Sequence, residues 1–154
     1  MKRIAPAFLF TLLLLPWTAT AENTAPPGFD EALARSLGAD DYGMRQYVLV
    51  ILVTGPTPVP AGAERDEMFR GHFTNMKRLA ADGKLVVAGP LDGVNGWRGL
   101  FLLATDDLDE AAALVATDPV IMHGEMVAMY HKYYGSAGLM LVNDTHVKLA
   151  RKNF

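Results

Sequence analysis

The order of apolar and polar positions over residues 46–133 predicts alternating strands and helices. Residues 46–53 form a nearly continuous run of aliphatic and β-branched side chains, which is typical of a strand covered on both faces. Residues 55–62 are rich in proline and glycine and predict a loop, because proline cannot donate to a strand ladder. Shorter apolar runs predict three further strands at residues 84–88, 99–104 and 126–133.

Two helices are expected between these strands. Residues 64–82 place Met68, His72 and Met76 on one stripe at helical spacing, with acidic residues near the start and basic residues near the end. A second helix is expected over residues 106–117, because the Asp-Pro pair that follows bends or breaks it.

The resulting order, β-α-β-β-α-β, is that of the ferredoxin-like α+β arrangement. Two helices cover only one face of its sheet, so we expect a homodimer that packs sheet against sheet and buries the other apolar face. We assign this domain to residues 46–142. Residues 22–45 are expected to form a linker and a short helix (29–37), residues 139–142 a further strand, and residues 143–154 a polar C-terminal tail.

The first 21 residues predict a cleaved secretory signal peptide. Two basic residues precede an apolar stretch, residues 4–17, that is too short and too interrupted by proline to span a bilayer. The small-x-small triplet at residues 19–21 fits signal peptidase, so we expect a mature periplasmic or secreted protein that starts near Glu22. A retained N-terminal anchor is the alternative.

The amino-acid composition excludes several kinds of site and argues against two classes of binding partner. Of the 154 residues, 51% are hydrophobic, which is enough for a sizeable core, and none is cysteine, which excludes disulfides, thiolate metal sites and a thiol nucleophile. Without the signal peptide, 12 Lys and Arg face 17 Asp and Glu, for a net charge of −5. This balance, with no basic cluster, argues against nucleic acid and against a membrane surface as partners.

His72 and Asp118 are the candidate catalytic residues. His72 lies on the apolar stripe of its helix, where a hydrogen-bond partner tunes the proton affinity of an imidazole. Asp118 lies where a helix ends before proline, a position that can aim a carboxylate inward and fix the tautomer of a histidine. The alternatives are a core histidine bonded to a backbone carbonyl and a solvated aspartate at a helix end.

Four further residues are candidate ligand contacts. Gly89 and Pro90 close the second strand, where glycine permits close approach of a ligand, although an ordinary strand connection explains them equally well. Trp97 and Tyr130 offer aromatic area for a small ligand, with strand and interface packing as the alternative for Tyr130.

Metal and cofactor motifs are missing from the sequence. The spacing of His123, Glu125 and His131 matches no zincin-like motif, so no metal is expected, with a transition-metal site at these residues as the alternative. No phosphate-binding loop, dinucleotide-binding glycine motif or serine nucleophile elbow is present, and no cofactor is expected.

Two spaced motifs resemble the YCII-related (YciI-like) domain family. The first combines His72, Gly83 eleven residues later, and the triplet Ala88-Gly89-Pro90 after the second strand; the second combines Asp118-Pro119 with Gly124. Residues 37–50 and 133–137 resemble an exported subgroup of that family. The resemblance covers roughly residues 37–141.

This resemblance implies a dimeric α+β barrel of ferredoxin-like units, with a pocket around a histidine and an aspartate proposed as a catalytic pair. On this chain the pair corresponds to His72 and Asp118. Related sheet dimers include muconolactone isomerase-like enzymes, and one YCII-type member is a dehydrochlorinase acting on a chlorinated hydroxyhydroquinone. The chain departs from relatives at His123 and at His131-Lys132, where a reshaped pocket mouth is expected.

The sequence therefore predicts an isomerase or lyase in which His72 is the general acid/base and Asp118 orients it, acting on a small cyclic or aromatic substrate. The alternative is a non-catalytic dimeric module that binds a small ligand in the same pocket. A purely structural role of the sheet dimer is the third hypothesis.

Overall fold

A four-stranded antiparallel sheet organises the computed structural model, which describes residues 25–152. The strand order is β2-β3-β1-β4. The strands are β1 (Met44–Thr54), β2 (Leu85–Pro90), β3 (Trp97–Leu103) and β4 (Met126–Ser136). The signal peptide predicted from residues 1–21 lies outside the described part of the chain.

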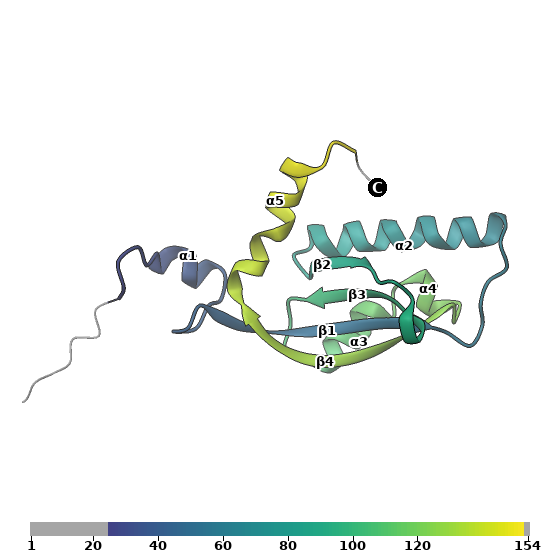
Figure 1. Ribbon diagram of the computed structural model, residues 1–154, viewed down its shortest axis with the longest axis horizontal. Helices are drawn as coiled ribbons and strands as arrows, with labels where there is room; N and C mark the ends of the chain where they lie inside the picture. Colours follow the sequence, from purple (N-terminus) through teal and green to yellow (C-terminus); the bar gives the residue numbers. More distant parts are fainter. Residues whose placement is uncertain (1–24, 153–154) are drawn as a thin grey trace, which may run out of the picture.

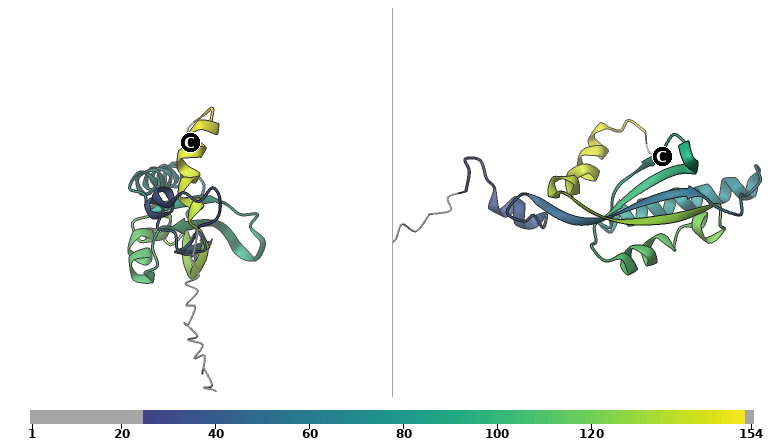
Figure 2. Two further views of the ribbon diagram at one scale, coloured as in Figure 1. Left: turned by 90° about the vertical axis from the view of Figure 1, so that its left-hand side faces the viewer. Right: turned by 60° about the horizontal axis from the view of Figure 1, so that its bottom comes forward.

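Three helices lie on one face of this sheet: α2 (Ala63–Ala81), α3 (Leu108–Val115) and the short α4 (Pro119–Met122) (Figures 1 and 2). Leaving aside the short elements, the chain therefore runs β-α-β-β-α-β, and the predicted ferredoxin-like α+β class is confirmed. The Asp-Pro pair separates α3 from α4, as predicted, because proline is tolerated only in the first turn of a helix.

The main core lies between the sheet and these helices. Val48, Val50 and Leu52 of β1 are at most 2% exposed and point toward the helices, as alternate residues of a strand do. They pack against buried residues of α2, α3 and α4, among them Met68 and Val115. Burial of this kind supplies most of the free energy that favours folding.

The other face of the sheet is apolar but only partly covered. Tyr47 and Ile51 are buried there, while their neighbours across the ladder on β4, Tyr133 and Met129, are 40% and 42% exposed. Val127 on the same face is 41% exposed. The short helix η2 (Ala137–Leu141) packs over one end of this face and leaves the rest open.

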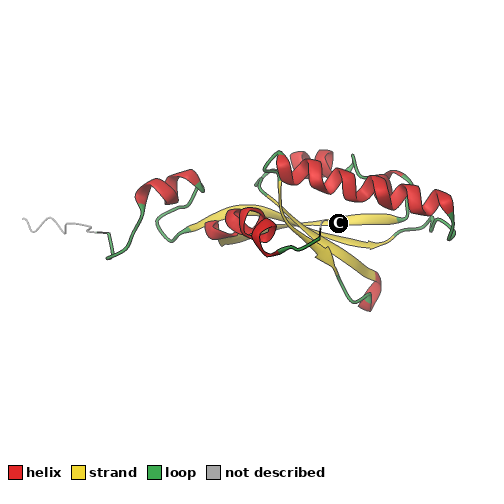
Figure 3. Ribbon diagram, turned by 90° about the horizontal axis from the view of Figure 1, so that it is seen from above, coloured by secondary structure: helices red, strands yellow, loops and turns green. Residues whose placement is uncertain are grey.

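The ends of the described chain add helices rather than strands. Figure 3 shows α1 (Glu31–Ser36) beyond one end of the sheet and away from α2. The strand predicted at residues 139–142 is wrong: η2 and then α5 (Val142–Leu149) occupy this stretch. The Ser136 side chain accepts a hydrogen bond from the Gly138 N–H, which turns the chain into the helical region directly after β4.

The remaining short helix is η1 (Val94–Gly96), in the connection between β2 and β3. Within residues 25–152 there is no helix with the length and apolar character needed to cross a membrane.

Candidate active site

Helix α2 carries His72 toward the sheet. Its buried side chains are Met68, His72, Asn75 and Leu79, which follow one another at intervals of three or four residues and so form a single stripe. The imidazole is surrounded by aromatic rings: the ring centroids of Phe69, Phe73 and Phe101 lie 6.0, 5.3 and 6.0 Å from that of His72. The predicted apolar setting of this histidine is confirmed.

Asp118 lies at the start of α4, directly beside α2. Its carboxylate accepts a hydrogen bond from the Val120 N–H at 3.1 Å and so caps the helix. The close approach of the two helices depends on Gly71, since a Cβ at that position would lie only 2.9 Å from Cγ of Pro119. The glycine before His72 thus lets the carboxylate come within reach of the imidazole.

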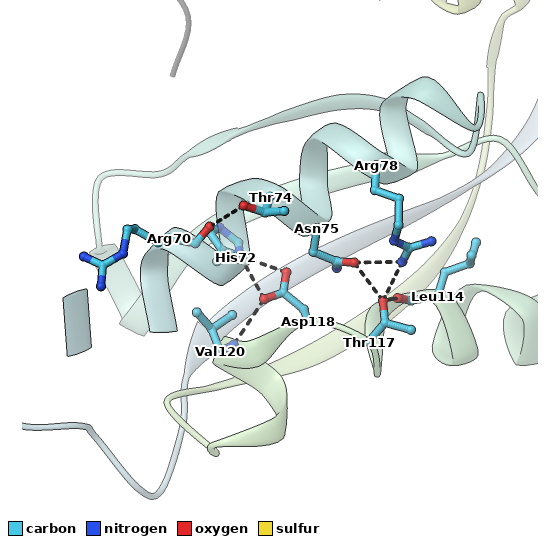
Figure 4. A network of polar contacts seen from close by, with 9 residues as sticks. All are labelled: Arg70, His72, Thr74, Asn75, Arg78, Leu114, Thr117, Asp118 and Val120. Atoms are coloured by element: carbon cyan, nitrogen blue, oxygen red, sulfur yellow. Dashed lines mark hydrogen bonds and ion pairs between the residues drawn. The ribbon is translucent and has the colours of Figure 1, made fainter. Parts of the chain in front are cut away.

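The two candidate catalytic side chains are in direct contact (Figure 4). His72 Nδ1 lies 2.9 Å from Oδ1 and 2.8 Å from Oδ2 of Asp118. His72 is 8% exposed and Asp118 is fully buried. Because an ionised carboxylate can only accept, it favours the tautomer with hydrogen on Nδ1 and leaves Nε2 as a free base. Asp118 is therefore both a helix cap and the partner of His72.

A polar network beside this pair holds the chain that leads into Asp118. Arg78 donates from Nη2 to Oδ1 of Asn75 at 2.7 Å, and the Thr117 hydroxyl lies 3.1 Å from the same oxygen (Figure 4). The Thr117 hydroxyl also donates to the Leu114 carbonyl at 2.7 Å. Residue 117 is thereby tied to α2 and to α3 at once, which fixes the backbone next to the carboxylate.

His72 lines a cavity of about 450 Å³ between α2 and the sheet. Gly89 and Pro90, two of the residues predicted to contact a ligand, line the same cavity. Within the described chain, Nε2 of His72 has no hydrogen-bond partner, so the free base is available to a molecule in this cavity. Most of the remaining wall is apolar, which is typical of small-molecule sites.

The two predicted aromatic contacts lie elsewhere. Trp97 begins β3, is 43% exposed, and is not part of the cavity wall. Tyr130 lies on β4, on the helix side of the sheet, and packs against the main core; burial raises the pKa of its phenol. The structure thus brings together four of the six predicted site residues.

An ion-pair cluster at the end of the sheet was missed by sequence reasoning. Glu125 is 1% exposed, and its carboxylate lies 2.7 Å from Nη2 of Arg65 and 3.6 Å from Nη1 of Arg98. The Val59 N–H also donates to it at 2.7 Å. Burial acts to raise the pKa of Glu125, but these donors and charges outweigh it, so the pKa lies below its usual value.

In the sequence, Glu125 lies close to His123 and His131. Among residues 25–152 no group of three or more histidine and carboxylate side chains is placed to hold a metal ion. Glu125 instead pairs with Arg65, in the first turn of α2, and with Arg98 on β3. Because both partners are far from Glu125 in the sequence, no local spacing predicts these contacts.

Comparison with known proteins identifies the domain. A search of curated proteins found no match. One solved structure that resembles the chain is 5-chloro-2-hydroxyhydroquinone dehydrochlorinase from Burkholderia phenoliruptrix, in complex with 2,5-dihydroxybenzoquinone, at 18% identity and a TM-score of 0.42, over 56% of this chain and 92% of that one. The model of the YCII-related domain matches residues 47–131, which include His72, Asp118 and the cavity. The chain therefore belongs to the YCII-related domain family.

Proposed function

We propose that this protein is a small-molecule enzyme of the isomerase or lyase type, with His72 as general acid/base. One observation carries the proposal: Asp118 holds the buried Nδ1 of His72, while Nε2 of the same ring is free toward an apolar cavity. A histidine oriented in this way is suited to proton transfer near neutral pH.

The arrangement supports a simple reaction course on a small cyclic or aromatic substrate. Nε2 of His72 removes a proton from a carbon made acidic by a neighbouring carbonyl group, and Asp118 stabilises the resulting imidazolium. The same nitrogen then returns the proton to another atom of the substrate, which completes an isomerisation. Alternatively, a leaving group departs with its electron pair, which completes an elimination. The apolar wall keeps water from competing for the proton.

The test uses a substrate analogue that reports proton removal alone. In 5-nitrobenzisoxazole, loss of one ring proton breaks the N–O bond and yields a coloured phenolate, so a positioned base is sufficient. We expect the wild-type protein to accelerate this opening and the His72→Ala variant to be slower by about 10²–10⁴-fold. His146→Ala is the matched control, because His146 is an exposed histidine on α5. Equal rates for wild type and His72→Ala would contradict a catalytic role.

The second candidate function is a non-catalytic module that holds a small ligand in this cavity. This alternative rests on the size of the cavity, about 450 Å³, and on its apolar wall, which are both typical of small-molecule sites. It predicts a ligand that raises the melting temperature of the protein and is recovered unchanged after long incubation, together with equal rates for wild type and His72→Ala in the assay above.

We further propose that two chains associate through the open face of the sheet. Val127, Met129 and Tyr133 are exposed apolar side chains on that face, next to the buried Tyr47 and Ile51. Apolar area of this kind is costly in water and is buried on association.

The mass of the particle in solution tests this association. We expect a dimer for the wild type by light scattering coupled to gel filtration, and a monomer for Met129→Asp, because a carboxylate would be buried without a partner. Met122→Asp is the matched control: Met122 is 72% exposed at the end of α4, on the helix side, and this variant is expected to stay dimeric. A monomeric wild type would refute the proposal.

Export is part of the same proposal. The basic start, the short apolar stretch and the small residues at 19–21 support cleavage after Ala21. Mass spectrometry of the protein recovered from its producing cell is expected to give a chain that starts at Glu22; an intact N-terminus would overturn the assignment.

A further inference from the structure

The cavity that His72 lines contains a second charged group. Arg98, on β3, contributes to the wall of the same cavity. The register between β1 and β3 shifts at this point: Leu52 pairs with Gly99 and Val53 with Trp97, so Arg98 is the extra residue of a bulge. His72 and Arg98 are the titratable side chains of a wall that is otherwise built of apolar residues, glycine and proline.

The positive charge of Arg98 is only partly balanced. Its nearest carboxylate is Glu125, at 3.6 Å, which is beyond hydrogen-bond distance. Glu125 is already paired with Arg65 at 2.7 Å and with the Val59 N–H at 2.7 Å. Two guanidinium groups therefore share one carboxylate. The lowered pKa of Glu125 keeps this carboxylate ionised, but its single negative charge balances only one of the two positive charges.

The hydrogen-bonding groups of Arg98 are also available. Arg65 donates from Nη1 to the Val59 carbonyl, pairs with Glu125 through Nη2 and lies over the Phe69 ring. By contrast, no residue within 25–152 accepts a hydrogen bond from the guanidinium of Arg98, whose side chain is 30% exposed. A planar fork of donors on a residue that lines an apolar cavity is suited to bind a carboxylate or a comparable oxyanion.

The charge near His72 has the other sign. The Asp118 carboxylate contacts His72 Nδ1, and no Lys or Arg side chain within residues 25–152 forms an ion pair with it. An anionic group is therefore disfavoured beside His72 and favoured beside Arg98, which orients the ligand in the cavity.

Resting on the function proposed above for this site, we propose that the substrate is a small ring-containing anion. Its carboxylate, or an equivalent oxyanion, is bound by Arg98, and its reacting C–H bond is directed at His72 Nε2. Arg98 is then the residue that selects this class of substrate.

Paired probes of nearly equal shape test the preference for an anion. Phenylacetate carries a carboxylate where phenylacetamide carries an uncharged amide. In NMR titrations followed at the amide signals of the cavity residues, we expect the wild-type protein to bind phenylacetate about tenfold more tightly, because a charge-assisted hydrogen bond is worth more than a neutral one.

Variants at residue 98 test whether Arg98 causes the preference for the anionic probe. Arg98→Met is expected to bind both probes equally, and Arg98→Lys to retain part of the preference, since it keeps the charge but not the fork. Arg70→Met removes the same charge from α2 outside the cavity wall and is expected to match the wild type. A preference that survives Arg98→Met overturns the inference, and so does a wild-type protein that binds neither probe or prefers the amide.

Failure of this inference can be told apart from failure of the proposed function. The proton-transfer assay uses an uncharged probe and reports His72, whereas the paired probes report Arg98 by binding alone. Anion preference without proton transfer would leave a binding module for small anions. Proton transfer without anion preference would leave the enzyme and remove only the substrate class assigned to it.

Discussion

Replacing Asp118 with asparagine is expected to slow proton transfer from 5-nitrobenzisoxazole by about 10²–10⁴-fold while the fold is kept. Both carboxylate oxygens lie within 2.9 Å of His72 Nδ1 and can only accept its hydrogen. An asparagine amide donates to Nδ1 as readily as it accepts, and a donated bond moves the hydrogen of the imidazole to Nε2. The base that faces the cavity is then lost, although the histidine itself is unchanged.

The fold survives this change because asparagine is as good a helix cap as aspartate, so the bond to the Val120 N–H remains. Asp107→Asn is the matched control: Asp107 caps α3 in the same way, at 2.8 Å from the Asp109 N–H, but it is exposed and does not contact His72. We expect its rate to equal that of the wild type.

Ring-nitrogen NMR of His72 separates orientation from simple damage to the site. The wild type is expected to carry the hydrogen on Nδ1, and Asp118→Asn to carry it at least in part on Nε2. A slow Asp118→Asn variant with the wild-type tautomer would show that Asp118 acts in some other way. An unchanged rate together with an unchanged tautomer would make Asp118 a helix cap and nothing more.

The elements near this site follow from local patterns, and the sequence predicts them well. The strand expected at residues 46–53 is β1, Met44–Thr54, and the helix expected at 64–82 is α2, Ala63–Ala81. Apolar runs and helical stripes are set by the side chains that a strand or helix buries, so they are visible in the sequence itself. The inward direction of His72 was predictable for the same reason.

The contact between His72 and Asp118 was suggested by the family resemblance and could not be derived from spacing. The two residues are 46 positions apart, and their meeting depends on how closely α2 approaches the start of α4. That approach rests on Gly71 against Pro119, a packing detail between two helices. Periodicity within one helix carries no information about such a detail.

The place of Arg98 in the cavity wall could not be predicted from the sequence, for a different reason. Alternation along β3 assumes a regular ladder, and the bulge at Arg98 breaks it. Glu125 has two histidines near it in the sequence, yet its partners are arginines 27 and 60 residues away. The error at residues 139–142 is local: apolar residues predicted a strand, and the Ser136 turn placed them in helices.

Gly55→Ala is expected to cause the largest loss of stability among the substitutions considered, about 3 kcal/mol. Gly55 follows β1, and its N–H donates to the Glu125 carbonyl at 2.8 Å. A Cβ at residue 55 would lie 2.1 Å from the Gly124 carbonyl oxygen and 2.8 Å from the Glu125 carbonyl carbon. Both are backbone atoms, so the clash is relieved only by separating the end of β1 from the start of β4.

Thermal unfolding followed by circular dichroism measures this effect, and a fall of about 10 °C in the melting temperature is expected for a domain of this size. Gly89→Ala is the matched control, because a Cβ there meets no atom within 4 Å and the backbone has an ordinary φ; its stability is expected to stay within about 0.5 kcal/mol of the wild type. If the two variants melt together, the close approach at Gly55 is not a constraint on the fold. If only Gly55→Ala is unstable, the close packing of the end of β1 against the start of β4 depends on the missing side chain at residue 55.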